Sequence, residues 1–290
     1  MFLTFLSDLG HEDAFLGVCK GVIARIAPEV TVIDLLHLVQ VQDVGQGAGV
    51  LASAIPYLPT PAVHLALVDP FRTVPARGIA IRTADGSTFV APDNGLTSHA
   101  WDVAGGVVSA HVLDDTSLWL PNAARTFRAR DVFSPVAARL AAGLPIEHVG
   151  TKVSPDELER LEVRPPSVDD DHVHAEVVTV DHFGNLTLNV TRSHLEAAGI
   201  QLGDDVEMRC GGKTMHMTFT LTYGEVPRGR VALCEDSFRT ITVAVNQGSA
   251  AKVLRANRAD PLVIARVHKP APVAVGPVRV YDEPPSTVTA

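Results

Sequence analysis

Cysteine is scarce in this sequence: Cys19, Cys210 and Cys234 are its three cysteines, and they lie far apart. Because none of them forms a Cys-x-x-Cys pair, the sequence indicates neither a disulfide framework nor a zinc site. We expect three buried free thiols, as is usual in a reducing compartment. Several scattered histidines form no His-x-His or His-x-x-x-His pattern with one another, so we expect no metal site from them. They are His11, His37, His64, His99 and His182.

Long basic and long apolar runs are also absent. The formal net charge is -9 without clustered Lys and Arg, which argues against a nucleic-acid partner. No apolar stretch approaches about 20 residues, so no membrane-spanning helix is expected. The apolar N-terminus lacks a basic segment and suits a first strand better than a signal peptide, and we expect a cytoplasmic protein. Neither Gly-x-Gly-x-x-Gly nor a P-loop motif occurs, which removes the common dinucleotide and P-loop interpretations.

The first half of the chain alternates strand-like and helix-like patterns. Apolar runs predict strands at 2–6, 30–35 and 63–68, and amphipathic patterns predict helices at 14–26 and 44–55. This βαβαβ order predicts an α/β fold with helices on both faces of an N-terminal sheet. Further elements are predicted as a hairpin at 78–82 and 87–91 and a helix at 131–142.

The pattern changes near residue 165. Residues 164–171 contain two prolines and three consecutive aspartates, a composition typical of a linker. We predict an α/β domain at 1–165, a smaller all-β, barrel-like domain at 172–268 and a flexible tail at 269–290. The β-rich segments of the second domain are at 176–180, 187–190, 205–210, 231–233 and 240–245.

Four short polar signatures follow or interrupt the apolar runs. They are Ser-Asp-Leu-Gly at 7–10, Val-Asp-Pro at 68–70, Asp-His-Phe-Gly-Asn at 181–185 and Asn-Gln-Gly-Ser-Ala-Ala at 246–251. Strand ends are where α/β proteins usually bind ligands, so we expect their polar groups to gather at one site.

In this order the signatures resemble the family of S-adenosylmethionine hydroxide adenosyltransferases, relatives of the nucleophilic fluorinase and chlorinase. The resemblance extends to about residue 267. It implies hydrolysis of S-adenosylmethionine to adenosine and methionine, with this small molecule as substrate and no cofactor. It also implies a homotrimer, in which the N-terminal domain of one subunit and the C-terminal domain of a neighbour form each site.

Asp8 follows the first predicted strand. A carboxylate accepts two hydrogen bonds side by side, so it can hold the vicinal hydroxyls of a ribose. The alternative is a helix N-cap. The resemblance implies the ribose role for Asp8 and a role for Asp13 in positioning the amino acid end of the substrate.

Asp69 follows the buried strand pattern, and the resemblance places it beside the sulfonium-bearing carbon. Because methionine leaves as a neutral thioether, the reaction needs no general acid; the enzyme must orient water and accept a proton. A simple turn role before Pro70 is the alternative. In the halide-using relatives this Asp is replaced and an insertion follows, whereas this chain keeps Asp69 and lacks the insertion.

Two positions depart from the family pattern. Without gaps, the family's first Arg after this Asp falls on Ala76, and the family's His falls on Arg128. Arg72 and Arg77 are close enough in sequence to replace the missing guanidinium, and Arg128 can supply positive charge without passing a proton. The candidate catalytic residues are thus Asp69, Arg72, Arg77 and Arg128, with surface ion pairs as the alternative for each Arg.

The second half supplies the remaining candidate contacts through the resemblance. Asp181 meets the substrate ammonium, Phe183 packs on the ligand, and the Asn185 amide contacts the adenine edge. Tyr223 stacks on adenine, with a core aromatic as its alternative. Ser237 binds the methionine carboxylate. The backbone around Asn246 and Ser249 closes over the purine.

Two other functions stay open. The altered positions 76 and 128 are compatible with a protein that binds adenosylmethionine or a nucleoside and catalyses weakly. The additional arginines are compatible with a halide or other anion adenosyltransferase, although the retained Asp69 argues against it.

Overall fold

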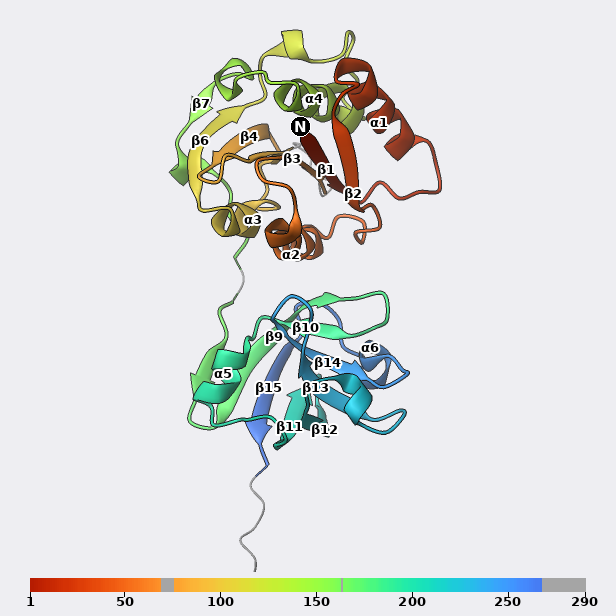
Figure 1. The fold of residues 1–290 in the computed structure, drawn as a ribbon, viewed down its shortest axis with the longest axis vertical. Helices are drawn as coiled ribbons and strands as arrows, with labels where there is room; N and C mark the ends of the chain where they lie inside the picture. The colour runs from red at the N-terminus through yellow and green to blue at the C-terminus, as the bar shows by residue number, and fades with distance from the viewer. Residues whose placement is uncertain (69–75, 163, 268–290) are drawn as a thin grey trace, which may run out of the picture.

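The computed structural model describes residues 1–68, 76–162 and 164–267 of the chain, which fold into two parts (Figure 1). Asp69, Arg72 and the tail at 269–290, all of which carry predictions, lie outside the described residues. The first part contains a seven-stranded sheet with the order β2-β1-β3-β5-β4-β6-β7. Its strands are β1 (Phe2–Ser7), β2 (Thr31–Leu36), β3 (Val63–Leu67), β4 (Gly78–Thr83), β5 (Thr88–Pro92), β6 (Val107–Val112) and β7 (Lys152–Val153).

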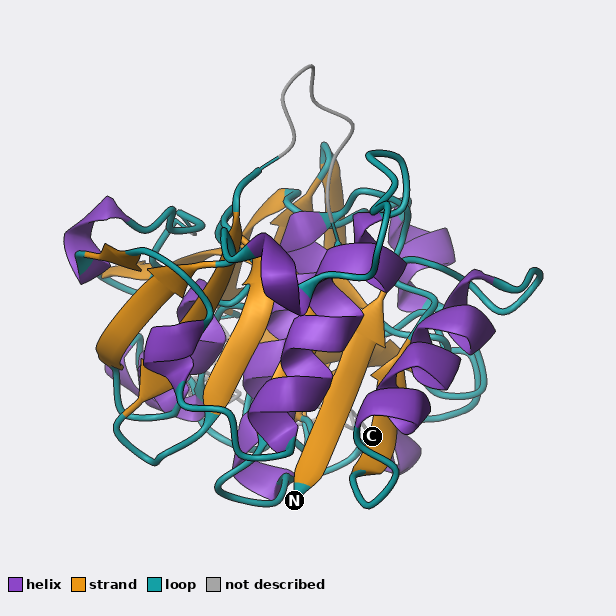
Figure 2. Ribbon diagram, turned by 90° about the horizontal axis from the view of Figure 1, so that it is seen from above, coloured by secondary structure: helices purple, strands orange, loops and turns teal. Residues whose placement is uncertain are grey.

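Helices cover both faces of this sheet, as predicted (Figures 1 and 2). One face is covered by α1 (Phe15–Ile26) and α4 (Ser134–Ala141), and the other by α2 (Val44–Ala54) and α3 (Ser98–Val103). Side chains of β1 alternate between the two cores: Phe5 packs with the first pair of helices, whereas Leu6 packs with the second.

The carboxyl ends of β1 and β3 lie side by side. These strands are parallel neighbours, with Ser7 aligned to Leu67. The amide of Asp8 donates to the carbonyl of Leu67 at 3.3 Å. All of β3 is buried, as its continuous apolar run predicted. Leu67 and Asp8 therefore lie at the same edge of the sheet.

The second part is a closed β-barrel, which confirms the predicted class. Strand β9 pairs with both β15 and β10, so the order β10-β14-β13-β12-β11-β15-β9 returns to its start. The strands are β8 (Ser167–Asp169), β9 (His172–Val180), β10 (Leu186–Leu188), β11 (Asp205–Cys210), β12 (Lys213–Phe219), β13 (Val231–Glu235), β14 (Ile241–Val245) and β15 (Pro261–Arg266). Two short helices, α5 (Arg192–Ala197) and α6 (Ala250–Leu254), flank them.

Some elements differ from the sequence-based expectation. Part of the predicted linker is strand β8, because the Asp run forms a hairpin turn with Asp170 at φ 49° before β9 begins. The helix expected at 131–142 begins as a π-helical turn at Ala129–Phe133 and continues as α4. Helix α3 and strands β6 and β12 had no prediction.

Helix α2 lies between the sheet and the barrel. A Cβ at Gly47 would meet the Leu96 side chain at 2.8 Å, on the sheet side. A Cβ at Gly49 would meet Thr179 and Val178 of β9 at 3.2 Å, on the barrel side. Small residues on both faces of α2 thus let the two parts approach closely.

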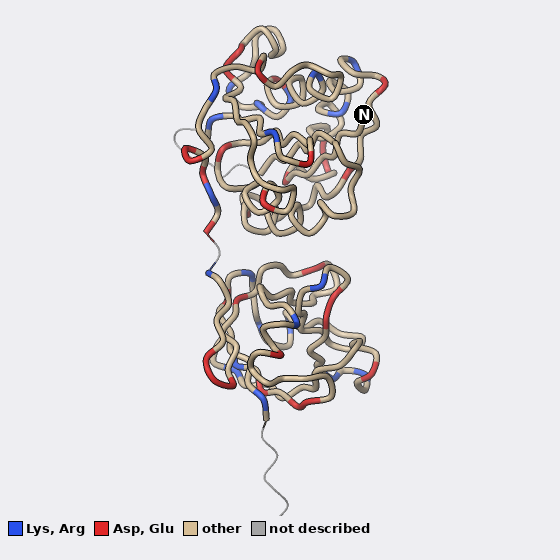
Figure 3. Tube along the Cα trace, turned by 60° about the vertical axis from the view of Figure 1, so that its left-hand side comes forward, with Lys and Arg blue, Asp and Glu red and all other residues tan. Residues whose placement is uncertain are grey.

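Charge and cysteine placement agree with the composition. Acidic and basic residues are interspersed over both parts (Figure 3). All three cysteines are buried and free, as expected. Across the described ranges, no helix is long and apolar enough to span a membrane. The same residues contain no group of three or more His, Cys, Asp or Glu that could hold a metal ion.

Candidate active site

A cleft of about 870 Å³ lies between helix α2 and the barrel. Its N-terminal wall comes from the end of β2 and from α2, and its other wall comes from barrel turns. Five of the residues singled out from the sequence line it: Asp181, Phe183, Asn185, Tyr223 and Ser237. The fold therefore brings together side chains that are separated by more than fifty positions.

The turn at 181–185 is organised by its own polar side chains. Asp181 accepts from the backbone amide of Asn185 through Oδ1 and from its side-chain Nδ2 through Oδ2, both at 2.8 Å. The amide of Ala251 donates to the carbonyl of Gly184 at 2.9 Å, which joins this turn to the signature at 246–251. Two signatures that are distant in sequence are thus joined, and the first of them lines the cleft.

Two aromatic rings in the cleft are exposed. Phe183 is 74% and Tyr223 is 53% exposed, and both line the cleft. The alternative of Tyr223 as a core aromatic is therefore wrong. Exposed aromatic rings that face a cleft are available to stack on a flat ligand.

Contacts between the two parts border the cleft. Tyr57 donates through its hydroxyl to the carbonyl of Ser237 at 3.3 Å, and its ring meets Phe238 edge-on, with centroids 5.9 Å apart. Arg258 of the barrel pairs with Asp43, the N-cap of α2, at 2.6 Å. These contacts hold the barrel rim against α2.

Asn246 and Ser249 have local structural partners. Asn246 donates through Nδ2 to the carbonyl of Val226 at 2.7 Å. Ser249 caps α6 by accepting from the amide of Lys252 at 3.3 Å. Neither is among the residues that line the cleft. Their bonds keep the 246–251 segment in place behind the turn that does line it.

Asp8 is half-buried at the end of β1, and burial raises the pKa of its carboxyl. Its Oδ2 accepts from the amide of Gln42 at 2.9 Å, so it is not the N-cap of α1. Asp13 accepts from the amide of Phe15 at the start of that helix, at 2.9 Å. Neither carboxylate lines the cleft within this single chain.

Arg77 and Arg128 line a second hollow of about 350 Å³, together with Ala76 and Trp119. Arg77 pairs through Nε with Oδ2 of the buried Asp93 at 2.8 Å. The Arg128 guanidinium donates to the carbonyl of Ala76 at 2.7 Å and lies 5.0 Å from the Phe133 ring centroid. The two arginines thus lie close to Ala76, on one hollow.

The family model for the N-terminal domain of the S-adenosylmethionine hydroxide adenosyltransferases matches residues 3–150, and the model for their C-terminal domain matches residues 175–263. The chain belongs to this family. The resemblance inferred from the polar signatures is confirmed.

Two hydrolases match most of the chain, and a fluorinase matches a smaller part of it. The (R)-S-adenosyl-L-methionine hydrolase of Salinispora tropica is 42% identical over 261 residues, covering 90% of this chain and 96% of that protein. The hydrolase of the same name from Thermus thermophilus is 38% identical, covering 86% and 94%. A fluorinase from Nocardia brasiliensis is 29% identical over 72% of this chain and 78% of its own length.

A solved structure shows the same fold. An uncharacterized conserved protein from Thermotoga maritima superposes with a TM-score of 0.85 at 34% identity, covering 91% of this chain and all of that one. The two proteins therefore share the fold over almost their whole length.

Sequence reasoning missed two buried residues that follow β5. Asn94 donates through Nδ2 to the carbonyl of Val68 at 2.8 Å, and Asp93 pairs with Arg77 as described. Asn94 thus holds the backbone of Val68, and Asp93 holds the side chain of Arg77. The Asp-Asn-Gly run directly after an apolar run is the sequence signal that would have indicated them.

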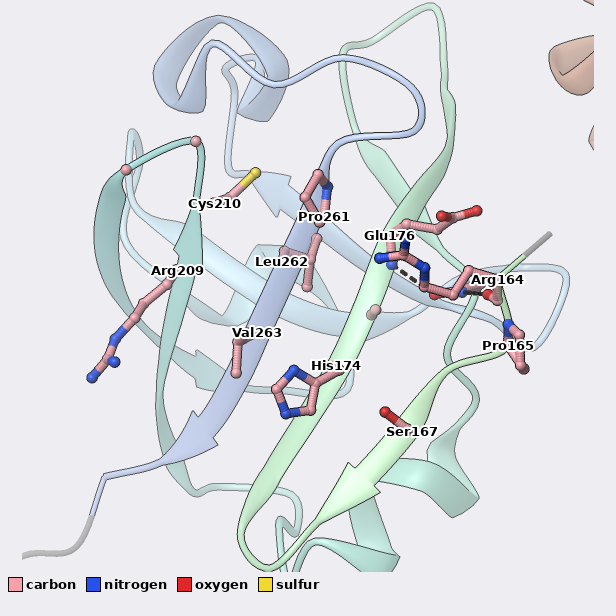
Figure 4. A pocket seen from close by; sticks show the side chains of 14 residues that line it. Arg164, Pro165, Ser167, His174, Glu176, Arg209, Cys210, Pro261, Leu262 and Val263 are labelled. Carbon is pink, nitrogen blue, oxygen red and sulfur yellow. Dashed lines mark hydrogen bonds between the residues drawn. The ribbon is translucent and has the colours of Figure 1, made fainter.

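A third hollow, of about 300 Å³, lies on the barrel alone (Figure 4). Figure 4 shows His174 and Glu176 on one strand beside Val263 on the next, with Arg209 and Cys210 further across. None of the candidate catalytic or substrate-binding residues predicted from the sequence lines it. We therefore place the candidate active site in the cleft and not in this hollow.

Proposed function

We propose that this chain hydrolyses S-adenosyl-L-methionine to adenosine and L-methionine by in-line attack of water at C5′ of the adenosyl group. The observation that carries the proposal is the match to hydrolases, at 42% identity over 96% of the Salinispora tropica protein. The fluorinase match is weaker, at 29% identity over 78% of that protein. No separate cofactor is part of the proposal.

The cleft supports binding of such a ligand. Asp181 is proposed to meet the ammonium group and Ser237 the carboxylate of the methionine moiety. Asn185 is proposed to contact the adenine edge, since its amide offers both a donor and an acceptor. The exposure of the Phe183 and Tyr223 rings supports stacking on the purine. Asn246 and Ser249 are proposed to act by shaping the backbone behind that turn.

Asp8 is proposed to hold the ribose hydroxyls, with Asp13 near the amino acid end. Since neither lines the cleft of a single chain, we propose a homotrimer in which a neighbouring subunit completes each site. The exposed Phe183, at 74%, supports a surface that is covered in the assembly. A solution mass equal to one chain of 30.8 kDa would exclude the trimer.

The proposal keeps the predicted domain bounds, with the α/β domain at 1–165 and the barrel domain at 172–268.

Asp69 is proposed to orient water and take its proton, while a guanidinium stabilises the negative charge. Because Arg77 is engaged by the buried Asp93, its proposed part is to anchor the segment that leads to the site. Arg128 is then the better source of positive charge, with Arg72 as a further candidate. The sulfonium leaves as a neutral thioether, so Arg is sufficient where no proton has to be returned.

One incubation tests the proposal. The purified protein is mixed with S-adenosyl-L-methionine, with and without chloride, and the nucleoside product is identified by mass. Hydrolysis predicts adenosine under both conditions, and about a hundredfold slower release of adenosine with Asp69→Asn. A chlorinated nucleoside would instead support an anion transferase, and binding without any product would support a binding protein. The altered positions 76 and 128 make the binding protein the second candidate function.

A further inference from the structure

Four polar side chains form a continuous hydrogen-bonded series behind Asp8. Ser7 Oγ lies 2.7 Å from His37 Nδ1, and His37 Nε2 lies 3.2 Å from Asp34 Oδ1. Lys20 donates to Asp34 Oδ2 at 2.7 Å. Ser7 is fully buried and His37 is 2% exposed. The series therefore runs from a solvent-exposed ion pair into the interior of the sheet edge.

The chemistry of the acceptors assigns the direction of each bond. An ionised Asp34 only accepts, so the proton of a neutral His37 ring is on Nε2. The other ring nitrogen, Nδ1, is then an acceptor, and the Ser7 hydroxyl donates to it. Burial opposes ionisation of Asp34, but hydrogen bonds from Lys20 and His37 outweigh it and lower its pKa. Burial also lowers the pKa of His37, which keeps the ring neutral at pH 7.

The series holds the turn that carries Asp8 at two points. Ser7 Oγ accepts from the amide of Leu9 at 3.3 Å while its hydroxyl is directed to His37. The carbonyl of His37 accepts from the amide of Gly10 at 2.8 Å. Asp8 lies between these points. One histidine thus holds the backbone on both sides of Asp8, through its ring and through its carbonyl, while the Asp8 carboxylate itself accepts from the amide of Gln42.

We propose that His37 is a positioning residue, which orients Ser7 with the help of Asp34 and thereby aims the Asp8 carboxylate at the hydroxyls of the bound ribose. This inference rests on the proposed function. A nucleophilic role for Ser7 does not fit, because its side chain is fully buried and its hydroxyl donates to His37 while it accepts from the amide of Leu9.

The same sheet contains a matched pair for comparison. Thr4 Oγ1 lies 2.8 Å from His64 Nδ1, and both residues are buried. Within the described residues the His64 ring makes no hydrogen bond to a carboxylate, and Thr4 is followed by strand and not by a ligand turn. Variants of this pair therefore measure the stability that is lost with a buried hydrogen bond between a hydroxyl and an imidazole. No ligand-binding residue depends on this bond.

The test compares Ser7→Ala and His37→Gln with Thr4→Val and His64→Gln in the full-length chain. Calorimetry with adenosine and with S-adenosyl-L-methionine gives affinity, adenosine release gives kcat and KM, and thermal unfolding gives stability. For Ser7→Ala and His37→Gln we expect about tenfold weaker adenosine binding, because a misoriented Asp8 carboxylate makes poorer hydrogen bonds. KM should rise and kcat should change little, since the effect is on binding. The second pair should lose stability and keep its affinity.

A pH profile adds a readout that a purely structural role would not move. Protonation of His37 turns Nδ1 into a donor, so Ser7 loses its acceptor and affinity should fall at acid pH. The groups that face this ring are Asp34, Lys20 and His11, whose ring centroid is 5.5 Å away. In His37→Gln the acid-side loss should be smaller than in the parent.

The outcomes separate this inference from the proposed function. If the parent binds adenosine and the Ser7 and His37 variants bind it equally well, the positioning role is excluded while the function stands. If the parent neither binds nor hydrolyses the ligand, the function fails, and crystal structures of His37→Gln and His64→Gln decide the inference. A displaced Asp8 carboxylate only in the former supports it, and an unmoved one overturns it.

Discussion

The guanidinium of Arg128 donates a hydrogen bond to the backbone carbonyl of Ala76, 2.7 Å away. These are the two positions at which the sequence departs from the family pattern. The contact places both departures at one point of the fold. Arg128 thus carries a positive charge to the backbone of position 76, where this chain has no charged side chain of its own.

The first prediction follows from this contact. Arg128→Ala should lower turnover by about one to two orders of magnitude, because a guanidinium near the developing charge is lost. The double variant Ala76→Arg with Arg128→His should recover most of that loss by restoring the family pair. Adenosine release, measured by chromatography, checks both. Full turnover in Arg128→Ala would exclude Arg128 from the reaction.

A second prediction concerns Asp69. Asp69→Asn should lower turnover by about two orders of magnitude, a typical loss for a general base. Affinity for S-adenosyl-L-methionine should change little, because the amide keeps the shape of the carboxyl group. Calorimetry and single-turnover hydrolysis measure the two effects separately. The exposed Asp156→Asn is a control that should match the parent.

The third prediction tests the ribose contact. Asp8→Ala should weaken binding of adenosine at least about tenfold, since hydrogen bonds to a carboxylate are charge-assisted. Because burial raises the pKa of Asp8 above its ordinary 3.8, the parent should lose affinity on acidification at a higher pH than a fully exposed aspartate would. Unchanged calorimetric affinity in a folded Asp8→Ala protein would show that the ribose lies elsewhere.

The fourth prediction uses the exposed rings of the cleft. Phe183→Ala and Tyr223→Ala should each weaken adenosine binding by about three- to tenfold, as expected for the loss of one aromatic contact. Thermal stability should stay close to that of the parent, because these rings are largely exposed. A large fall in the unfolding temperature with intact binding would instead indicate a structural role.

The fifth prediction concerns stability and pH. Burial lowers the pKa of His64 from 6.5 to about 4. The unfolded state therefore binds a proton that the folded state excludes, so this contribution is complete above pH 6.5 and is lost as pH falls toward about 4. The loss should approach about 1.4 kcal/mol per pH unit within that range. Urea unfolding of the parent and of His64→Gln measures it, and the variant should show the shallower dependence.

Local patterns sufficed for much of the fold. The apolar run at 63–68 predicted a strand buried on both faces, and β3 is one. Strand β12 had no prediction, although Met215, Met217 and Phe219 alternate with His216 and Thr218 at the period of a strand. Its antiparallel pairing with β11 is a contact that local propensity does not specify.

The sequence indicated several residues of the cleft but not the hydrogen bonds and ion pairs that they or their neighbours make. The polar signatures after strand patterns indicated Asp181 and Tyr223, which the fold brings to one cleft. The partner of Arg77 is Asp93, and nothing in the local sequence relates the two. The bond between His37 and Ser7 depends on the parallel register of β1 and β2, which a single sequence does not specify.

Helix α2 acts as a spacer of minimal thickness between the sheet and the barrel. Gly47 meets Leu96 on the sheet side, and Gly49 meets Thr179 and Val178 on the barrel side. Gly49 lines the cleft, whereas Gly47 does not. A larger side chain at Gly49 would act as a wedge between the helix and the barrel, so the closeness of these two walls depends on a residue that bears no functional group.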